Sequence, residues 1–435
     1  MWRINLVGSE AAIDRRAWSV FHACCVTLGM AMFPSFATAS SGQSESYLLG
    51  FSIDLESKEH LLLELGVIQL PGEPSSPVFL NVFAQGGKLV GGVRGDGRIG
   101  WLYPMARNTL SPCDLSATGS REMLLRRVDN RLQLAIDGKA CLDLVLDPAS
   151  SELWDQHTVL ATAAASQLQS LGLAANVRET VFGERGWSSQ VEQVSYLTNR
   201  LTTHQTQLGW KLLWDGVSTA GWRGARLNHF PEKGWQIQDG VLSVLSSGGA
   251  ESRNGGDIIT TDEYTHFDLE VDFRLTPGAN SGIKYFVLPN LLKEEGSAIG
   301  LEFQILDDQL HPDAKKGLNG NRTVGSLYDL IPAENQLFTA EGKPFVGVGR
   351  WNRARVRVCG LEVEHWLNNQ PVVRYQRSTQ MFRALVSHSK YAKWQGFGEA
   401  PSGPILLQDH GDLVSFRSIK IRPLTVASEG RSSCK

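Results

Sequence analysis

The chain has 435 residues, and its 42% hydrophobic content excludes intrinsic disorder and suffices for two cores of sandwich size. The formal net charge of −3 provides no broad positive field for phosphate backbones or acidic membranes, so we expect no nucleic-acid partner. The 44 Gly and 12 Trp, against 6 Met, favour turns and aromatic-rich sheets and predict an all-β protein.

The first 39 residues have the pattern of a signal peptide. Arg15 and Arg16 precede an apolar stretch over 17–33, and Ala37-Thr38-Ala39 provides an A-x-A cleavage pattern. We therefore expect an exported protein, periplasmic or extracellular, that begins near Ser40; a buried helix is the alternative. The apolar stretch is short for a bilayer, and no later segment is both long and uncharged, so we expect no membrane span.

Residues 47–190 indicate a first β domain with a linker. Leu132, Leu134 and Ile136 alternate with other residues, and Asp137-Gly138 then forms the dipeptide of a type I′ hairpin turn. The pattern predicts a laminin-G-like or lectin-like sandwich. Between residues 151 and 207 Ala, Ser, Thr and Gln become frequent, and we expect a helix over 161–171 in a partly helical linker.

Residues 208–424 show a sharper strand pattern and predict a second sandwich. Asp239-Gly240 predicts another hairpin, and over 267–275 apolar residues alternate with Asp and Glu, so we expect one buried and one solvated face. Segments 126–141 and 355–372 share a strand-turn-strand pattern, which fits two copies of one fold. Residues 425–435 are expected to be a disordered tail.

The cysteines give no metal-binding pattern. Cys24 and Cys25 lie in the predicted signal peptide, and no CxxC or Cys/His zinc spacing occurs. Cys113 and Cys141 could form a disulfide in an exported protein or could be buried thiols, and the sequence does not decide. Cys434 lies in a polar, Ser-rich tail, where we expect it not to pack.

Several common catalytic motifs are absent from the sequence. It contains no G-x-S-x-G, no H-E-x-x-H and no Walker loop. GDGRIG over 95–100 matches a dinucleotide-binding pattern, but it lies among hairpin segments with no βαβ context, so we interpret it as a glycine-rich turn.

Polar residues interrupt three apolar strands of the second half. In IGLEFQILD, Glu302 and Gln304 share one face; in PILLQDHG, Gln408 and His410 share a face while Asp409 points away. Lys284 lies in NSGIKYFV. If these strands adjoin, the side chains line a polar concavity suited to sugar hydroxyls and proton transfer. The alternative is an exposed, solvated sheet face.

An ordered series of motifs over about residues 208–424 resembles the 3-keto-disaccharide hydrolase family, whose fold is similar to the concanavalin A-like (jelly-roll) sandwich. The motifs are ANSGIKYF, LEFQILDD, VGSLYDLIP, GRWNRARV, HWLNNQPV, SKYAKWQGFGE and ILLQDHGDLVSFRSIKIRPL. The resemblance implies two concanavalin A-like domains if the first half shares the fold. Lys284 and Ser418 stand where the family pattern usually has Arg and Asn.

The resemblance also implies roles for residues within these motifs. Glu302 and His410 are expected to be catalytic. The expected substrate-binding residues are Asn280, Lys284, Gln304, Tyr328 and Gln408. A divalent cation is an expected cofactor of unknown identity, with Glu302 and His410 as candidate ligands.

The implied reaction cleaves glycosides whose glucose unit carries a ketone at C3. That carbonyl acidifies the C2 proton, so a base can form an enolate that expels the C1 oxygen before water adds. A metal near the C3 oxygen would stabilise the enolate. An ordinary retaining glycosidase needs a second carboxylate, and Asp307, the obvious candidate, falls on the opposite strand face from Glu302.

Two other function classes stay open from the sequence. The sandwich fold serves carbohydrate-binding proteins as well as enzymes, and the Trp residues could stack on sugars. The first half could also be an interaction module that anchors the second to a partner. The identity of the glycoside and the oligomeric state are not determined by the sequence.

Overall fold

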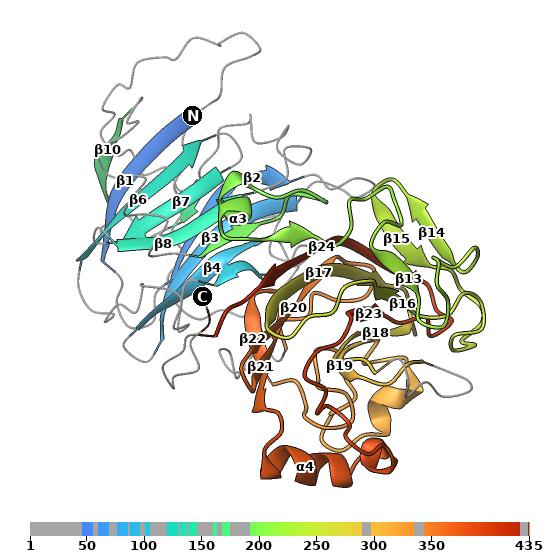
Figure 1. Ribbon diagram of the computed structural model, residues 1–435. Helices are drawn as coiled ribbons and strands as arrows, with labels where there is room; N and C mark the ends of the chain where they lie inside the picture. Colours follow the sequence, from blue (N-terminus) through green and yellow to red (C-terminus); the bar gives the residue numbers. More distant parts are fainter. Residues whose placement is uncertain are drawn as a thin grey trace.

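The computed structural model describes residues 192–288, 297–334, 343–426 and 434, together with separate strands between residues 46 and 174. The part after residue 192 is a two-sheet β-sandwich, seen in green to red in Figure 1, with a short helix at its lower end. No helix among the described residues is long and apolar enough to cross a membrane.

The larger sheet of the sandwich has eight strands. Their order is β14-β15-β24-β17-β20-β21-β22, and β12 pairs with β24 at one end. The bounds are β12 Lys211–Leu212, β14 Trp235–Gln238, β15 Val241–Val244, β17 Phe267–Leu275, β20 Asn352–Cys359, β21 Glu362–Leu367, β22 Gln370–Gln376 and β24 Val414–Pro423.

The smaller sheet has five strands, and short helices connect several strands of both sheets. The strand order is β13-β16-β23-β18-β19. The bounds are β13 Trp222–Gly224, β16 Ile258–Thr260, β18 Asn280–Tyr285, β19 Leu301–Leu306 and β23 Leu406–Leu407, with helices α3 Thr203–Gln207, η3 Pro312–Lys315, α4 Gln380–Ser387 and η4 Lys390–Lys393.

The hydrophobic core lies between the two sheets. Phe267, Leu269, Val271 and Phe273 of β17 are all at most 1% exposed, and Phe273 meets Phe303 of β19 edge to face at 6.5 Å. Alternation therefore places one face of each strand in the core, as the sequence predicts. Burial on this scale is the main stabilising contribution to the sandwich.

A small polar network crosses this core. The Tyr285 hydroxyl lies 2.7 Å from His365 Nε2 and 2.9 Å from the Tyr375 hydroxyl, while His365 Nδ1 donates to the Gly325 carbonyl at 3.1 Å. Every member has a partner, which is what a buried polar group requires. Burial lowers the pKa of His365 to about 4, so its ring is neutral at pH 7.

The predicted hairpin at Asp239-Gly240 is confirmed. Gln238 pairs with Val241, and the two turn residues have φ values of 50° and 70°. Both central residues of a type I′ turn need positive φ, which Gly adopts freely and Asp tolerates. The first-half hairpin is also present, because Ile136 pairs with Lys139.

The outer face of β17 differs from the sequence-based expectation. Asp268, Glu270 and Asp272 were expected to be solvated, yet all three are buried. Two arginines of β20 pair with them: Arg355 with Asp268 at 2.6 Å and Arg353 with Asp272 at 2.7 Å. Charged partners from a distant strand allow this polar face to be covered, which local alternation cannot reveal.

Glu270 lies at the centre of this charged face. Its carboxylate is 2.9 Å from Lys420 of β24 and 3.4 Å from Arg353. Burial alone would raise the pKa of Glu270, but the positive charges of Lys420 and Arg353 outweigh it and hold the value at about 2. The carboxylate is therefore ionised at all ordinary pH values.

Residues 192–199 cover the charged face. Arg353 donates to the Ser195 carbonyl at 2.8 Å, Arg355 pairs with Glu192 at 2.7 Å, and the Tyr196 ring lies 4.3 Å from the Arg353 guanidinium. Asn199 accepts from the Ser418 amide at 2.8 Å. Ser418, which stands where the family pattern usually has Asn, has a φ of 52° in β24. It does not line the site described below, so this difference affects the packing of residues 192–199 against β24.

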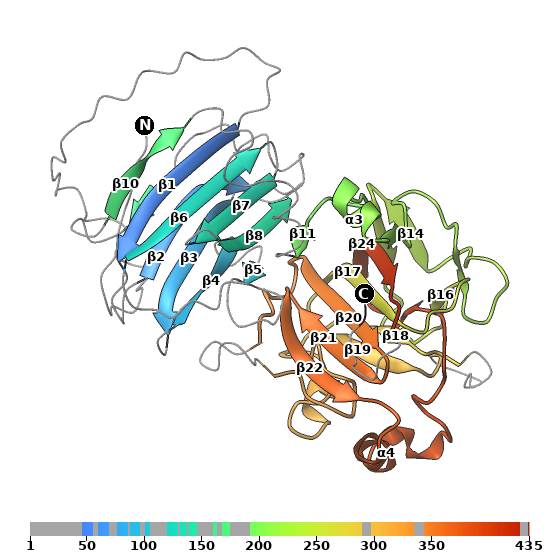
Figure 2. The ribbon, with the colours of Figure 1, turned by 60° about the vertical axis from the view of Figure 1, so that its left-hand side comes forward.

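The first half forms two further sheets, with strand orders β10-β1-β6-β7-β8-β11 and β5-β4-β3-β2-β9. The bounds are β1 Ser46–Asp54, β2 His60–Ile68, β3 Ser76–Gln85, β4 Lys88–Gly95, β5 Trp101–Pro104, β6 Ser120–Val128, β7 Arg131–Ile136, β8 Lys139–Val145, β9 Leu160–Thr162, β10 Leu168–Ala174 and β11 Gln193–Ser195. Strand β11, which comes from the segment after residue 192, pairs in parallel with β8, as Figure 2 shows. Assignment of these sheets to a lectin-like sandwich stays a prediction.

The helix expected over 161–171 is wrong. This part of the chain contributes strands β9 and β10, and β10 pairs antiparallel with β1 from Leu48 to Ile53. Cross-strand hydrogen bonds to a distant segment outweigh the helix propensity of Ala and Gln. The only helix described in the linker is the short α3, which Thr202 caps.

The predicted signal peptide and Cys113 lie outside the described residues.

The expectation for Cys434 is also wrong. Cys434 forms a disulfide with Cys359 at the end of β20, across a sequence separation of 75 residues. The polar composition of the tail suggested no packing, but a covalent bond does not require an apolar segment. Residues 425, 426 and 434 of the predicted disordered tail are described, and Val426 and Cys434 form a β-bridge.

Candidate functional site

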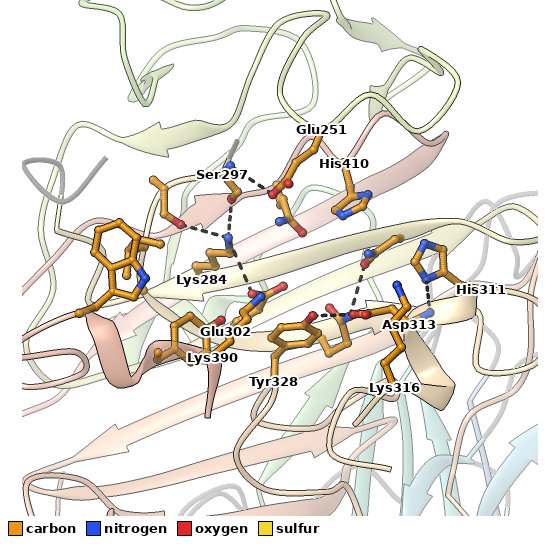
Figure 3. Close-up of a pocket in the computed structure, with 18 of the residues that line it drawn as sticks. Glu251, Lys284, Ser297, Glu302, His311, Asp313, Lys316, Tyr328, Lys390 and His410 are labelled. Atoms are coloured by element: carbon orange, nitrogen blue, oxygen red, sulfur yellow. Dashed lines mark hydrogen bonds and ion pairs between the residues drawn. The ribbon is translucent and has the colours of Figure 1, made fainter. Parts of the chain in front are cut away.

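A polar pocket of about 280 Å³ lies on the outer face of the smaller sheet, with walls from the loops after β19 and from η4. Figure 3 shows its floor on β18 and β19. All seven site residues predicted from the sequence line it: Asn280, Lys284, Glu302, Gln304, Tyr328, Gln408 and His410. The structure therefore brings the predicted set together, while the role of each residue stays a prediction.

Lys284 and Glu302 form a cross-strand pair in the pocket floor. They lie opposite each other in the antiparallel ladder of β18 and β19, and Lys284 Nζ is 3.7 Å from Glu302 Oε2. Gly282 makes room for the carboxylate, because a Cβ at that position would lie 2.3 Å from Glu302 Oε1. Both charged side chains are buried, so the pair works in a medium of low dielectric constant.

Hydrogen bonds hold the Lys284 ammonium from the other side. Its Nζ donates to the Ser297 hydroxyl and to the Ala298 carbonyl at 3.1 Å. The Ser297 hydroxyl in turn donates to Asp257 Oδ2 at 2.6 Å. Lys284 is therefore a fixed positive charge in the pocket floor, and Asp257 orients it through Ser297.

Two amide oxygens in the pocket lack partners. Gln304 Oε1 and Gln408 Oε1 are buried and accept no hydrogen bond from any described residue, although Gln304 donates through Nε2 to Asn280 Oδ1 at 3.3 Å. Buried acceptors without partners are costly and are common where a ligand supplies the donor. Sugar hydroxyls are donors of this kind.

Asp409 lies between two pocket residues but serves the fold. It does not line the pocket, and its carboxylate accepts from the amides of Gly256 at 3.0 Å and Gly411 at 2.9 Å. The structure thus agrees with the alternation predicted for Gln408, Asp409 and His410. Burial raises the pKa of Asp409 despite these two hydrogen bonds.

Tyr328 forms part of the pocket wall together with a charged cluster. Its hydroxyl donates to Asp313 Oδ2 at 2.5 Å, and Arg322 pairs with Asp313 at 2.9 Å and with Asp329 at 2.6 Å. Burial and the neighbouring Asp313 carboxylate raise the pKa of Tyr328 well above its usual value. The phenol therefore stays protonated and acts as a hydrogen-bond donor.

His311, His410 and Asp412 form a candidate metal site beside the pocket. One ligand atom from each lies within 4.8 Å of the others. Two imidazoles and a carboxylate suit a divalent transition metal. His410 Nδ1 is a buried nitrogen with no hydrogen-bond partner among the residues that the structure describes. Burial and the neighbouring His410 lower the pKa of His311, which favours the neutral ring that binds metals. Glu302 does not belong to this cluster.

Asp307 positions the loop that carries His311. Its carboxylate accepts from the amides of Gly278 at 2.8 Å, Gln309 at 3.0 Å and Leu310 at 3.2 Å. Burial would raise the pKa of Asp307, but these backbone hydrogen bonds outweigh it and lower the value. Asp307 does not line the pocket, which removes it as the second carboxylate of a retaining glycosidase.

Several residues that line the pocket were not predicted from the sequence. They are Glu251, Ser297, His311, Asp313, Lys316, Lys390, Lys393 and Trp394. Most lie on loops and 3-10 turns, where no periodicity marks the direction of a side chain. Two signals were present: His311 follows the Asp-Asp end of the LEFQILDD motif, and Lys390, Lys393 and Trp394 fall within SKYAKWQGFGE.

Comparison with known proteins finds relatives of the part of the chain that contains this site. Residues 209–422 match the family model described as a 3-keto-alpha-glucoside-1,2-lyase-like domain. A 3-keto-disaccharide hydrolase of Bacteroides thetaiotaomicron is 36% identical over 236 residues, which cover 50% of this chain and 79% of that protein. The chain belongs to the 3-keto-disaccharide hydrolase family. As a member of the 3-keto-disaccharide hydrolase family it is a glycoside-cleaving hydrolase, which confirms the expectation of an enzyme.

Solved structures give more distant matches to this 3-keto-disaccharide hydrolase family member. A proposed glycosyl hydrolase from Parabacteroides distasonis is 28% identical with a TM-score of 0.45, covering 52% of this chain and 100% of that one. The carbohydrate-binding module CBM66 from Bacillus subtilis is 14% identical with a TM-score of 0.26, covering 46% of this chain and 95% of that one.

Proposed function

We propose that this enzyme cleaves 3-keto-glycosides or 3-keto-disaccharides by removing the C2 proton, expelling the C1 oxygen and then adding water. The 3-keto-disaccharide hydrolase among its relatives supports the substrate class. The observation that carries the proposal is the buried Lys284–Glu302 pair beside two amide acceptors that no described residue satisfies. This arrangement joins a proton acceptor to a place for sugar hydroxyls.

Glu302 is the proposed base, and Lys284 its electrostatic partner. A carboxylate takes the C2 proton, electrons move into a C1–C2 double bond, and the C1–O bond breaks; the leaving oxygen takes a proton from water and departs as the alcohol. The hydroxide formed from that water adds at C1 while Glu302 returns its proton to C2, so the sum is glycoside plus water giving 3-keto-glucose and an alcohol. The Lys284 charge, 3.7 Å from Glu302, suits the negative charge that develops on the substrate.

His311, His410 and Asp412 are the proposed holders of a divalent cation. When bound, such a cation would polarise the C3 carbonyl and make the C2 proton more acidic. Because this cluster includes His410 but not Glu302, we propose Glu302 for proton transfer and His410 for the cation, two roles that the sequence left undivided. Gln304, Gln408 and Asn280 are the proposed contacts for sugar hydroxyls.

Release of the alcohol from a 3-keto-glucoside, measured with and without added Mn²⁺, tests this function. The matching glucoside without the C3 ketone should stay intact, because its C2 proton is not acidic. Binding of the 3-keto-glucoside without release of the alcohol would favour a carbohydrate-binding protein instead.

The proposal extends to the compartment and to the first half of the chain. A disulfide such as Cys359–Cys434 forms in oxidising compartments and so supports export by the predicted signal peptide. N-terminal sequencing of the secreted protein should find a chain that begins near Ser40; a chain that begins at Trp2 would contradict export.

The two N-terminal sheets are proposed to be a second, lectin-like sandwich. Expression of residues 40–190, followed by sugar-binding assays, can test this.

A further inference from the structure

One wall of the pocket is formed by η4 and the residue that follows it. The Ser389 hydroxyl accepts from the Tyr391 amide at 3.1 Å and caps η4, and Trp394 donates its amide to the Tyr391 carbonyl at 2.8 Å. The Tyr391 ring stacks on Phe397 at 3.9 Å. This wall, which we call the η4 wall (Lys390–Trp394), is therefore held firmly and presents Lys390, Lys393 and Trp394 to the pocket.

The η4 wall is positively charged, although the whole chain has a net charge of −3. Lys390 Nζ lies 4.0 Å from the centre of the Tyr328 ring, and Lys393 Nζ lies 5.7 Å from that of Trp394. Lys393 has no carboxylate partner in the part of the chain that the structure describes.

Three described carboxylates of this region pair with cations outside the η4 wall, and the charge of Lys390 also acts on Asp313. Asp329 and Asp313 pair with Arg322, and Glu302 faces Lys284. Asp329 also accepts from the Lys390 backbone amide at 2.7 Å, which fixes that backbone. Glu251 lines the pocket beside His410, on the side away from Lys390 in Figure 3. In the part of the chain that the structure describes, Lys390 and Lys393 therefore place two ammonium groups on one side of the pocket, at the η4 wall.

The proposed reaction fixes which part of the substrate meets this wall. If Glu302 takes the C2 proton and the C3 oxygen faces His311 and His410, the C1 oxygen points away from the histidines, because C1 and C3 flank C2. Figure 3 shows Lys390 on the Glu302 side of Tyr328 and the two histidines on the other side. The group that leaves from C1 then lies against the η4 wall.

From this geometry we infer that the η4 wall is the leaving-group subsite and that it selects leaving groups with a negatively charged substituent. The inference rests on the proposed function. The Trp394 indole offers a flat surface for a sugar or aryl ring, and Lys390 and Lys393 offer charge to a carboxylate on that ring. The substrate class is thus a 3-keto-glucoside whose leaving alcohol carries an acidic group.

Two matched substrates test the inference: the 4-carboxyphenyl and 4-carbamoylphenyl 3-keto-glucosides, which differ mainly in charge. The full-length enzyme should show a kcat/KM about tenfold higher for the carboxylate, and 0.5 M NaCl should reduce that preference. Lys393→Gln and Lys390→Gln should each lower the ratio of the two kcat/KM values by about three- to fivefold. Lys233→Gln, in an exposed turn outside the pocket, is the matched control and should keep the parent ratio.

The outcomes separate this inference from the proposed function. Cleavage of both substrates at equal kcat/KM, or a ratio unchanged in both η4-wall variants, overturns the inference and leaves the proposed function standing. If neither substrate is cleaved, the proposed function fails. In that case, calorimetric titration of the Glu302→Gln variant with each compound tests the leaving-group subsite by itself. Equal affinity for the two compounds overturns the inference. Tighter binding of the carboxylate, lost when Lys393→Gln is added, supports it.

Discussion

Lys284 and Glu302 face each other across β18 and β19, and their charged groups are 3.7 Å apart in the floor of a polar pocket. Neither strand alone makes this arrangement. Antiparallel pairing puts the two side chains on one face at the same level, and burial strengthens each charge's effect on the other.

Glu302→Gln should lower turnover of a 3-keto-glucoside by about 10² to 10⁴-fold, because the amide cannot accept the C2 proton. The free energy of unfolding should fall by less than about 2 kcal/mol, since Lys284 keeps Ser297 and Ala298 as acceptors. Turnover and urea unfolding measured on the same preparation check both parts. A fully active variant would show that Glu302 is not the base.

Gly282→Ala should impair catalysis without removing any functional group. The new Cβ would lie 2.3 Å from Glu302 Oε1, so the carboxylate must move. We expect kcat to fall at least about tenfold, because small displacements of a catalytic group are costly. Gly278→Ala is a poor control, because Gly278 has a φ of 74° and alanine would strain the backbone there. Ser281→Ala changes the other face of β18 and should leave kcat closer to that of the parent. An active Gly282→Ala enzyme would contradict the tight fit.

His410→Ala should weaken binding of Mn²⁺ and lower turnover together, because it removes one of three ligands in the proposed cation site. Asp409→Asn is the neighbouring control. Its side chain holds the Gly256 and Gly411 amides, so the expected loss is in stability, about 1 to 3 kcal/mol. Calorimetric titration with Mn²⁺ separates the two variants; unchanged Mn²⁺ affinity in His410→Ala would remove His410 from the site.

Stability should decrease as the pH falls from 7 to 5, with a measurable share from His365. Burial depresses its folded-state pKa to about 4, below the usual value of about 6.5. The neutral ring therefore contributes stability that is complete above pH 6.5 and is lost as the pH falls towards 4, about 2 kcal/mol by pH 5. Urea unfolding of His365→Gln should show a smaller loss over this range. Glu270 should not contribute there, because its loss begins only below about pH 4.5.

Cys434→Ser should lower the free energy of unfolding by about 2 to 4 kcal/mol, because the Cys359–Cys434 bond closes a long loop in the unfolded chain. Reduction of the parent should have a similar effect on its midpoint in urea, whereas the variant should not respond to reductant. A thiol count that finds both cysteines free in the secreted protein would contradict the disulfide.

Strand alternation was enough to predict much of the pocket but not its walls. Period two is a local property, so Glu302 and Gln304 could be placed on one face from the sequence, whereas Lys284 could join them only if its strand adjoined theirs. His311 and Lys390 lie beside 3-10 turns whose directions depend on the Asp307 and Ser389 hydrogen bonds, which no pattern reveals. The solvated face expected on β17 failed because its partners, Arg353 and Arg355, come from a strand about eighty residues away.

The cover that residues 192–199 place over Arg353 and Arg355 has a consequence for how this domain can be exchanged between proteins. Sequence similarity to the family begins at residue 209, but the packing begins earlier, because Glu192 and Ser195 bind the two arginines. Recombination that joined another partner domain at residue 209 would transfer the pocket intact and leave a charged sheet face open to water. The exchangeable unit of this protein is therefore longer than the segment that matches the family model.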